Sequence, residues 1–462
     1  MKIKILGAGK TVTGSCYSIS TNNEKIFVDC GMFQGGKDLE RLNYEEFNLK
    51  LKEYSALVLT HAHLDHCGRI PKLVKEGFRG KIFATAGTKE LAHIIMLDSA
   101  NIAKKDTENE NKRRVKEGLP KRKPLYTESD VKIAISLFRV VSYEEEIKIT
   151  PNITAKFYNA GHILGASCIQ LTINESGKKK IVTFSGDIGQ KESIIVKPTE
   201  PIANSDYVFI ESTYGDRLHP DISEREKELL RVINETIKKG GKLLIPSFAV
   251  ERAQDILYCI GKFQEQKLIP RVEVYLDSPM AMRATEVFSA HKEYYNESVL
   301  NALKTRKDAF NFPGLTHIKT TEESKALNSI KRPCIIIAGN GMCTAGRIKH
   351  HIVNSIDNPK NTLLLVGYQA EGTLGYWLEN GQKRIRLLGV QMDVRAKIES
   401  IDGFSGHADY MELISWLKNF SPKPKRVFIT HGEDIQIKAF SKRISQLEYD
   451  NYVPSMNEEI EL

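Results

Sequence analysis

Ten short apolar runs, each bounded by turn-forming residues, are the strongest constraint on the fold of this chain. They read KIKIL, KIFVDCG, ALVLTH, KIFATAG, KIVTFSGD, YVFIEST, KLLIPS, CIIIAGNG, TLLLVG and RVFITHG. Such runs are typical of strands buried on both faces, because they lack the polar alternation of a strand with one wet face. Helical patterns lie between several of them, for example at residues 223–238 and 251–264. Strands mixed with helices throughout predict a layered α/β protein.

Length and composition limit the class of protein. A chain of 462 residues exceeds what one hydrophobic core usually supports, so we expect two or three domains. The formal net charge of +9 suits a polyanionic partner such as nucleic acid, without establishing one. The seven cysteines are scattered and form no CxxC pair, which predicts reduced thiols and no cysteine zinc site. The first residues lack the pattern of a signal peptide and no apolar run reaches about 18 residues, so we expect a cytoplasmic protein with no membrane partner.

The stretch KIKILGAGKTVTGS near the first residue suggests a nucleotide-binding loop, but its residues exclude one. The dinucleotide fingerprint needs glycine where Val12 stands, and a phosphate-binding P-loop needs lysine after Gly14, where Ser15 stands. We therefore expect Gly7, Gly9 and Gly14 only to permit a tight turn between two strands.

Five of the apolar runs stop at an ionisable side chain. These side chains are Asp29, His61, Asp187, Glu211 and His431. In layered α/β folds, functional sites gather beyond the carboxyl ends of strands, because rigid strands aim the following residues at one crevice. One such coincidence is ordinary, but five of them favour a shared site.

The segment HAHLDH carries the densest group of side chains that can bind metal. In an extended segment His61 and His63 project to the same side, so both can reach one metal ion. Asp65 and His66 follow a turn and can reach a second metal close by. Imidazole nitrogens and carboxylate oxygens suit Zn²⁺, and coordination explains how so many histidines can be buried together. The alternative, an exposed histidine-rich turn, is the weaker interpretation after a buried strand.

Two metal sites need one more histidine and a bridging carboxylate. NAGHILGAS supplies His162 in a glycine-flanked loop, SGDIG supplies Asp187, and THGE supplies His431. Each alone has an ordinary structural interpretation: His162 as a core histidine, Asp187 as a turn aspartate and His431 as a capping residue. Together with HAHLDH they complete two metal sites.

These motifs, in their order along the chain, resemble the metallo-β-lactamase superfamily and, within it, the β-CASP branch of nucleic-acid-processing nucleases. The series is VDCG, HAHLDH, AGHILGAS, SGDIG, IESTYGD, FSGHADY and THGE. The resemblance implies one zinc ion bound by His61, His63 and His162, a second bound by Asp65, His66 and His431, and Asp187 bridging the two. It also implies that Asp29 supports the metal loop without binding metal, and that Asp65, Glu211 and His407 are catalytic.

The fold that the resemblance implies is a four-layer αββα metallo-β-lactamase sandwich with an inserted α/β β-CASP domain. We expect the sandwich to comprise residues 1–208 and 396–462, and the insertion to comprise residues 209–395. Such an insertion explains how Asp187 and His431, far apart in sequence, can become neighbours.

The activity that the resemblance implies is hydrolysis of phosphodiester bonds in single-stranded RNA, in RNA processing or decay, by a two-metal mechanism with two zinc ions per chain. RNA is favoured over DNA because the DNA-repair members lack a histidine at the last motif, where this chain has His431. The chain resembles most the minimal bacterial and archaeal relatives of the pre-mRNA 3′-end cleavage subunit. The pattern leaves open whether cleavage is internal or proceeds from the 5′ end, and the chain could assemble as a homodimer.

Two other functions are consistent with parts of the pattern. A small-molecule hydrolase of the same superfamily would share HAHLDH but lack the long insertion between ESTYG and FSGHADY. A catalytically inactive RNA-binding partner would have lost metal ligands, and all seven positions are filled here.

Two glycine-rich turns after buried strands, AGNGMCTAGR and GYQAEGTLG, are candidate phosphate-binding loops. Such turns expose backbone N–H groups that can bind phosphate oxygens. The shape of each turn alone does not decide whether it binds phosphate, and the resemblance favours contact with RNA phosphates. The candidate residues are Gly339, Gly341, Gly346, Arg347, Gly372 and Thr373.

Residues 104–123, KKDTENENKRRVKEGLPKRK, are highly charged and poor in apolar side chains. They predict an exposed helix and loop, in preference to an RNA-contacting surface.

Overall fold

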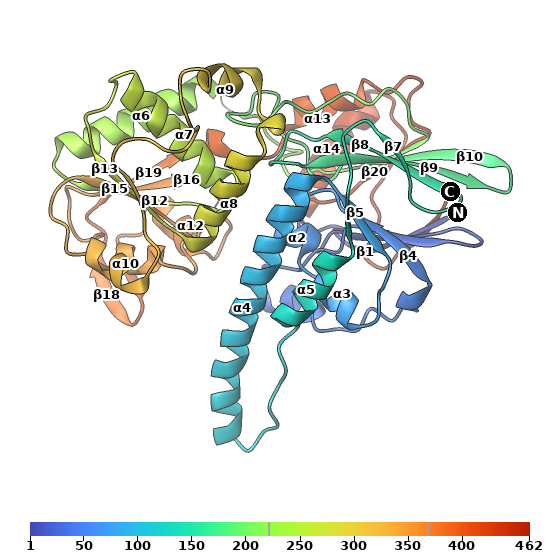
Figure 1. Cartoon of the computed structure of the whole chain (residues 1–462), viewed down its shortest axis with the longest axis horizontal. Coiled ribbons are helices and arrows are strands. Elements are labelled where there is room, and N and C mark those ends of the chain that lie inside the picture. The colour runs from blue at the N-terminus through green and yellow to red at the C-terminus, as the bar shows by residue number, and fades with distance from the viewer. Residues whose placement is uncertain (220–221, 368) are drawn as a thin grey trace. The chain divides into compact units, whose positions relative to one another are not determined.

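The computed structural model of the chain describes residues 1–219, 222–367 and 369–462, which form two compact units (Figure 1). Unit 1 comprises Met1–Leu218 and His407–Leu462, and unit 2 comprises His219–Gly406. The domain boundaries expected from the sequence, 208/209 and 395/396, stay a prediction. In the described part of the chain, no helix combines the length and the apolar character needed to cross a bilayer.

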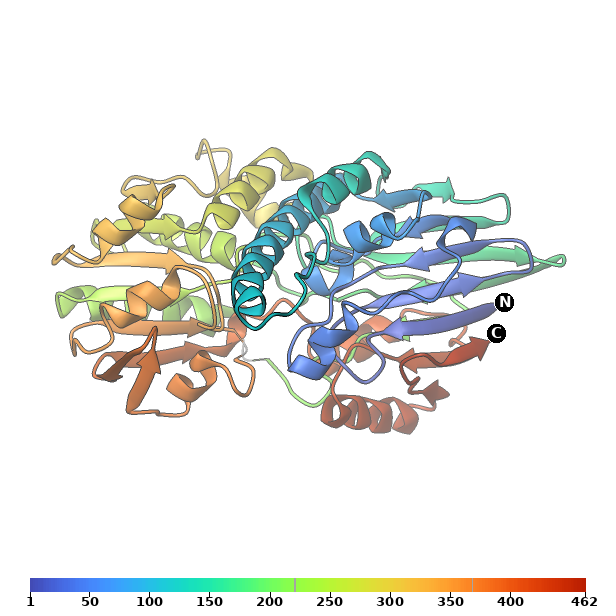
Figure 2. The same cartoon turned by 90° about the horizontal axis from the view of Figure 1, so that it is seen from below.

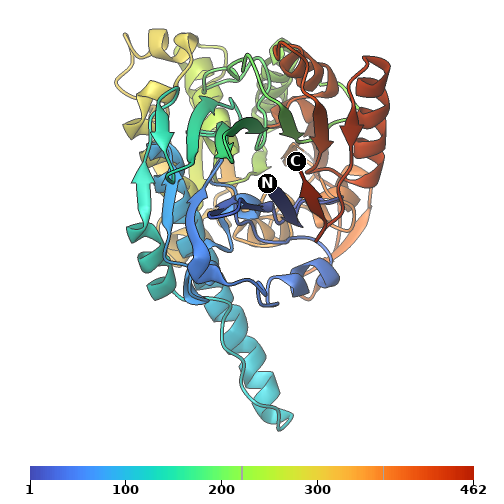
Figure 3. The ribbon, with the colours of Figure 1, turned by 90° about the vertical axis from the view of Figure 1, so that its right-hand side faces the viewer.

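Unit 1 contains two seven-stranded sheets that face each other (Figures 1 and 3). The first sheet has the order β22 (Glu459–Glu461), β1 (Lys2–Gly7), β2 (Cys16–Ser20), β3 (Lys25–Val28), β4 (Tyr54–Val58), β5 (Lys81–Ala84) and β6 (Phe138–Val140). The second has the order β21 (Asn451–Tyr452), β20 (Arg426–Ile429), β11 (Tyr207–Ile210), β10 (Lys178–Phe184), β9 (Ser167–Glu175), β8 (Ile153–Asn159) and β7 (Glu146–Lys148).

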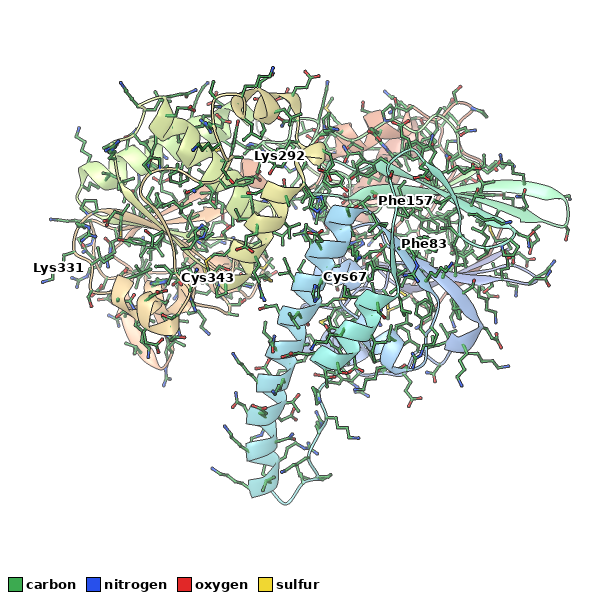
Figure 4. The ribbon with its side chains drawn as sticks, viewed as in Figure 1. Cys67, Phe83, Phe157, Lys292, Lys331 and Cys343 are labelled. Atoms are coloured by element: carbon green, nitrogen blue, oxygen red, sulfur yellow. The ribbon has the colours of Figure 1, made fainter. Side chains whose placement is uncertain are left out.

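One apolar core fills the space between these sheets. Ile5 and Val58 of the first sheet and Phe209 of the second are almost wholly buried in it. Phe83 and Phe157, which Figure 4 labels, belong to the same core. Burying side chains of this size stabilises each by roughly 1.5–3 kcal/mol relative to leaving it exposed, which holds the two sheets face to face.

Helices cover the outer faces of both sheets of unit 1 (Figure 2). They are α1 (Lys37–Leu42), α2 (Leu64–Cys67), α3 (Ile70–Lys75), α4 (Ala86–Lys116) and α5 (Glu128–Ser136) with the first sheet, and α13 (Tyr410–Leu417) and α14 (Asp434–Gln446) with the second. The resulting order of layers, helix, sheet, sheet, helix, confirms the predicted αββα sandwich.

Unit 2 is built on a six-stranded parallel sheet. Its order is β14 (Leu315–His317), β13 (Glu273–Asp277), β15 (Cys334–Ala338), β12 (Lys242–Pro246), β16 (Thr362–Val366) and β19 (Lys397–Ile401), and β17 (Arg384–Leu387) and β18 (Val390–Asp393) form a separate hairpin. Its helices are α6 (Ile222–Lys238), α7 (Arg252–Glu265), α8 (Pro279–Ala290), α9 (Glu297–Ala302), α10 (Thr321–Leu327), α11 (Ile348–Val353) and α12 (Leu374–Glu379). Every residue of β12, β15 and β16 is buried, as expected for a parallel sheet with both faces covered.

The insertion of unit 2 brings distant parts of the chain together in unit 1. Strand β11 precedes unit 2 and β20 follows it, yet the two pair in parallel from Tyr207–Arg426 to Ile210–Ile429. Their carboxyl ends therefore lie side by side, with Glu211 directly after β11 and His431 two residues after β20.

Candidate metal centre

The five ionisable residues predicted to follow buried strands all lie at the carboxyl ends of strands of unit 1. Asp29 follows β3, Glu211 follows β11, and His61, Asp187 and His431 stand two or three residues beyond β4, β10 and β20. Because adjacent parallel strands end at the same edge of a sheet, these side chains converge.

The HAHLDH segment turns as it leaves β4. Thr60–Ala62 have no regular structure, His63 is the residue before helix α2, and Asp65 and His66 occupy that helix. The close approach of Gly31 fixes this turn, since a Cβ on Gly31 would lie only 1.5 Å from the carbonyl oxygen of Asp65. The glycine of VDCG therefore permits the loop after β3 to pack against the segment that bears the histidines.

A first group of possible ligands gathers His61, His63, His162 and Asp187, whose donor atoms all lie within 4.8 Å of one another. His63 Nδ1 is 3.1 Å from His61 Nε2 and 3.0 Å from His162 Nε2. Asp187 Oδ2 is 3.4 Å from His61 Nε2 and 3.5 Å from His162 Nε2. Three imidazole nitrogens and a carboxylate oxygen thus point at one small volume.

A second group gathers Asp65, His66 and His431. His431 Nε2 is 3.2 Å from His66 Nε2 and 3.4 Å from Asp65 Oδ2. The other oxygen of Asp187, Oδ1, is 3.2 Å from His66 Nε2 and 3.5 Å from His431 Nδ1. Asp187 therefore presents one carboxylate oxygen to each group.

The chemistry of these donors fits metal cations. Among the described residues, the buried Oδ1 of Asp187 has no hydrogen-bond partner, although an unsatisfied buried polar atom is costly. Burial lowers the pKa of His61 to about 3 and that of His63 to about 4, so both are neutral at pH 7, the form that binds metal. A metal ion at each group would satisfy the nitrogens that face one another at 3.0–3.2 Å, together with the buried carboxylate between the groups.

Asp29 lies outside both groups and orients His66. Its Oδ2 is 2.7 Å from His66 Nδ1, and its Oδ1 accepts a hydrogen bond from the Thr60 backbone N–H at 2.8 Å. This contact leaves Nε2 of His66 to face the second group. Asp29 and His431 both have positive φ, 57° and 48°, a conformation that is costly for residues other than glycine and that clusters at functional sites.

Glu211 and His407 form a pair beside the two groups. His407 Nδ1 is 3.0 Å from Glu211 Oε2 and 3.2 Å from Oε1, and the Ile188 N–H donates to Oε1 at 2.6 Å. The Glu211 side chain is buried, whereas that of His407 is 20% exposed. Burial alone would lower the pKa of His407, but the carboxylates of Glu211 and Asp187 outweigh it and raise the pKa to about 9.

Two hydroxyl side chains at the site were not predicted from the sequence. Thr60 Oγ1 lies 2.9 Å from Asp29 Oδ2 and 3.1 Å from His61 Nδ1, and Thr213 Oγ1 lies 3.2 Å from His431 Nδ1. Thr60 contacts His61 on the ring nitrogen away from the ligand group, whereas Thr213 contacts the His431 nitrogen that also lies 3.5 Å from Asp187 Oδ1. Their only signal in the sequence is their position within THAH and ESTYGD.

The two glycine-rich turns lie in unit 2 and contact each other. The Gly375 N–H donates to the Met342 carbonyl at 3.2 Å, and the side chain of Gln369 donates to the Gly341 carbonyl at 3.2 Å. Tyr368 of the second turn lies outside the described residues. The structure thus joins the two predicted phosphate loops within one unit.

Within these turns, Arg347 and Thr373 already have structural partners. Arg347 Nη1 is 2.6 Å from Oδ1 of the buried Asp277 and also donates to the Ile318 carbonyl at 3.0 Å. Thr373 precedes α12, and its Oγ1 accepts from the Tyr376 N–H at 3.2 Å. Gly339, Gly341, Gly346 and Gly372 lie in the same two turns, and a Cβ on Gly346 would lie 2.2 Å from the Gly339 carbonyl oxygen.

Three family descriptions match successive parts of the chain. Residues 18–195 match the metallo-beta-lactamase superfamily domain, residues 253–378 match the Beta-Casp domain, and residues 391–454 match the Zn-dependent metallo-hydrolase RNA specificity domain.

Curated relatives match almost the whole chain. Ribonuclease TTHA0252 of Thermus thermophilus is 35% identical over 96% of each chain. An RNase J-like protein of Methanocaldococcus jannaschii is 34% identical over 98% of this chain and 97% of its own. Transcription termination factor FttA of the same organism is 31% identical over 98% of this chain and 70% of its own.

A crystal structure of an Enterococcus faecalis V583 protein of unknown function has the same fold, with a TM-score of 0.57 and 14% identity, over 100% of this chain and 99% of that one. The matched domains, their order and the relatives agree with the motifs that converge in unit 1. The chain belongs to the β-CASP branch of the metallo-β-lactamase superfamily.

Proposed function

We propose that this protein is a zinc-dependent ribonuclease that hydrolyses phosphodiester bonds of single-stranded RNA, in RNA processing or decay. The observation that carries the proposal is the pair of ligand groups that share Asp187. The names of two relatives, a ribonuclease and an RNase J-like protein, support RNA as the substrate. Cleavage within the strand and cleavage from the 5′ end are both compatible with this site.

Two zinc ions per chain fit the ligand groups. His61, His63 and His162 would hold one ion, and Asp65, His66 and His431 the other, with Asp187 contributing an oxygen to each. Such ions supply an activated water and stabilise negative charge on the phosphate. Asp29 holds His66 in the orientation that binding needs, which typically matters 10- to 100-fold for metal affinity.

The pair of His407 and Glu211 supplies a proton donor. A cleaved phosphodiester leaves a 3′-oxygen that needs a proton, and a positively charged imidazole is the right acid for it. Because Nδ1 of His407 is held by Glu211, Nε2 is the atom that can give up the proton. In this proposal Asp65, His407 and Glu211 act at the reacting phosphate or directly behind it.

The glycine-rich turns of unit 2 would hold RNA phosphates through Gly339, Gly341, Gly346, Arg347, Gly372 and Thr373. Arg347 is 23% exposed, so part of its guanidinium can face a phosphate while Nη1 stays with Asp277. If it does, Arg347→Ala weakens RNA binding and lowers the salt dependence, whereas an unchanged salt slope excludes the contact.

Three further points belong to the proposal. The sandwich comprises residues 1–208 and 396–462, and the insertion comprises residues 209–395. Two copies of the chain form a homodimer, and sedimentation can test this oligomeric state. The protein works in the cytoplasm, which the seven buried, unpaired cysteines support.

The decisive experiment compares cleavage of labelled single-stranded RNA by the wild type and Asp187→Asn. The substitution keeps the shape but removes the charge between the two ligand groups, so we expect roughly 1,000-fold or greater loss of cleavage, worth several kcal/mol of charge stabilisation. Asp450→Asn, an exposed aspartate of the same unit, is the matched control and should keep full activity. Parallel metal analysis should find two zinc ions in the wild type and fewer in Asp187→Asn.

Other outcomes identify the alternatives. Hydrolysis of lactones or thioesters without RNA cleavage would replace the proposal by a small-molecule hydrolase. RNA binding without cleavage, at well below one zinc per chain, would indicate an inactive partner. Comparing 5′-phosphorylated with 5′-blocked RNA then separates internal from end-directed cleavage.

A further inference from the structure

The second half of helix α4 and the segment that returns from it extend beyond the body of unit 1 (Figures 1 and 3). Ala100 is the last buried residue of α4, which continues to Lys116. At 1.5 Å per residue, these 16 further residues extend about 24 Å into solvent. We call residues 104–123 the basic arm.

The basic arm is held in a defined shape although it has almost no apolar core. The Asn111 side chain forms two hydrogen bonds with the backbone of Arg122, at 2.9 and 2.8 Å. Arg114 Nε donates to the Pro120 carbonyl at 2.8 Å. The backbone of the returning segment is therefore attached to the helix.

The charge of the chain is concentrated in the basic arm. It contains nine lysines and arginines and four aspartates and glutamates, a net charge of +5, out of +9 for all 462 residues. Arg113, Arg114 and Arg122 form ion pairs with Glu117 or Glu110. Within the described residues, the six lysines of the arm form no ion pair; they are Lys104, Lys105, Lys112, Lys116, Lys121 and Lys123.

Three of these lysines form one line along the helix. Separations of seven and eleven residues place Lys112 and Lys116 about 20° to either side of Lys105, so all three lie within about 40° around α4. All three are exposed. A line of cations suits the line of negative charges along a nucleic-acid backbone.

The arm offers no apolar face to a membrane or to a folded protein. Leu119 of the returning segment is exposed, and the exposed large apolar residues on α4 are Ile102, just before the arm, and Val115. They are 13 positions apart, about 220° around the helix, so they lie on different sides. An amphipathic membrane helix needs a continuous apolar side, which is missing here.

The other end of the same helix is fixed next to the candidate metal centre. Thr85, which caps α4, and Thr88 both donate to the Gly165 carbonyl, at 2.7 and 2.8 Å. Gly165 stands in the loop that bears His162. The distance along α4 from Thr85 to Lys112 is about 40 Å, which a stacked strand covers in about 12 nucleotides at about 3.4 Å each.

We propose that the basic arm binds the phosphate backbone of single-stranded RNA about 12 nucleotides away from the cleaved bond. The inference rests on the proposed ribonuclease function and adds a second, non-catalytic contact for long substrates. Short RNA reaches only the cleavage site, whereas longer RNA also reaches the lysines of the arm.

The test is the triple variant Lys105→Gln/Lys112→Gln/Lys116→Gln, because glutamine removes the charge and preserves helix propensity. Binding of a labelled single strand well above about 12 nucleotides is measured by fluorescence anisotropy over a range of salt, with the full-length chain and chelator to prevent cleavage. Each lost phosphate contact lowers the salt slope by about 0.7, so three lower it by about 2 and weaken binding about 100-fold near 0.1 M salt.

Two controls distinguish an effect of the arm lysines from a general effect of lost positive charge. Lys148→Gln/Lys178→Gln/Lys179→Gln removes three exposed lysines elsewhere in unit 1 and should leave affinity unchanged. The variant Lys105→Arg/Lys112→Arg/Lys116→Arg keeps the three charges and should retain RNA binding. With zinc present, the glutamine arm variant should raise KM for long RNA, leave kcat unchanged, and cleave RNA well below about 12 nucleotides at the wild-type rate.

Wild-type affinity and salt slope in the arm variant would overturn the inference, and so would an equal loss in the control variant. Arm-dependent binding of polyglutamate or of anionic phosphatidylserine vesicles without binding of RNA would also overturn it. Arm-dependent RNA binding in a protein that cleaves no RNA would uphold the inference and count against the ribonuclease proposal, so the two failures are distinguishable.

Discussion

Replacing Glu211 by glutamine should lower the pKa of His407 in the metal-free protein. Both carboxylate oxygens of Glu211 lie 3.0–3.2 Å from His407 Nδ1, and Asp187 Oδ2 is 3.9 Å away. Burial opposes the charged imidazole, but these carboxylates raise its pKa from 6.5 to about 9. Glutamine has the same shape and can still accept the Ile188 N–H, so the change isolates the charge.

The free energy that favours the charged form of His407 follows from the shift in its pKa. The difference between 6.5 and about 9 favours the charged form by about 3 kcal/mol, at about 1.4 kcal/mol per pKa unit. At pH 7.5 the wild-type imidazole is almost wholly protonated. Without the Glu211 charge, burial and the more distant Asp187 remain, and we expect the pKa of His407 to fall toward 6.5, which leaves the ring mostly neutral.

The same shift links stability to pH. Because the folded pKa of His407 is raised, its contribution to stability is complete below its unfolded pKa, near 6.5, and is lost as the pH rises through about 9. Metal-free wild type should therefore lose up to about 3 kcal/mol of this contribution between these two pH values, and Glu211→Gln should lose much less.

The assay is an NMR titration of the His407 ring in chelator-treated protein, with denaturation measured at both ends of the pH range. Glu433→Gln, at an exposed glutamate of the same unit, is the matched control and should leave the midpoint in place. A wild-type midpoint near 6.5, or the same midpoint in both proteins, would refute the assignment of the charge to the Glu211 pair. With zinc bound, Glu211→Gln should lower kcat with little change in KM.

Three other predictions concern the close approach of Gly31, the protonation of His66 and the pair of Asp277 and Arg347. Gly31→Ala places a Cβ 1.5 Å from the Asp65 carbonyl oxygen, so zinc content measured by mass spectrometry should fall while far-UV circular dichroism stays unchanged; full zinc occupancy would contradict the role of the close approach. The carboxylates of Asp187 and Asp29 raise the pKa of His66 against the effect of burial, so zinc binding should release protons, seen calorimetrically as heats that vary with the ionisation enthalpy of the buffer. Asp277→Asn leaves the buried end of Arg347 without its carboxylate and should cost about 3–5 kcal/mol in denaturant unfolding of unit 2, and a loss below about 1 kcal/mol would show that the pair is dispensable.

The fold could be predicted where strands are buried on both sides. All ten apolar runs form strands, namely β1, β3, β4, β5, β10, β11, β12, β15, β16 and β20. Strand β8, ITAKFYN, was not predicted, because it alternates buried and half-buried residues and belongs to a sheet near its edge. A strand with one covered face has no continuous apolar run, which is the feature that identified the other ten strands.

The candidate site was predictable because its ligands are rare residue types placed directly after strands. His61, His162 and His431 come from three separate parts of the chain, yet each follows an apolar run or lies between glycines. The contacts of Thr60 could not be predicted in this way, since threonine is common and its role depends on Asp29, which is 31 residues earlier.

The contacts of Arg347 could also not be predicted from the sequence. Its glycine-rich surroundings suggested a phosphate contact, whereas its partner Asp277 stands at the end of β13, 70 residues earlier. Pairing of a buried carboxylate with a distant arginine depends on strand order, and one sequence does not specify which parallel strands become neighbours.

The pairing of β11 with β20 has a consequence for biosynthesis. His66 and His431 are 365 residues apart, so at roughly 5–20 residues per second a ribosome needs about 20–70 seconds to make the second after the first. During that interval unit 2 can emerge and fold as a module, while the second group of ligands lacks its histidine. Under the proposed two-metal function, a nascent chain therefore lacks a ligand of the second group, and stays inactive, until translation has passed β20.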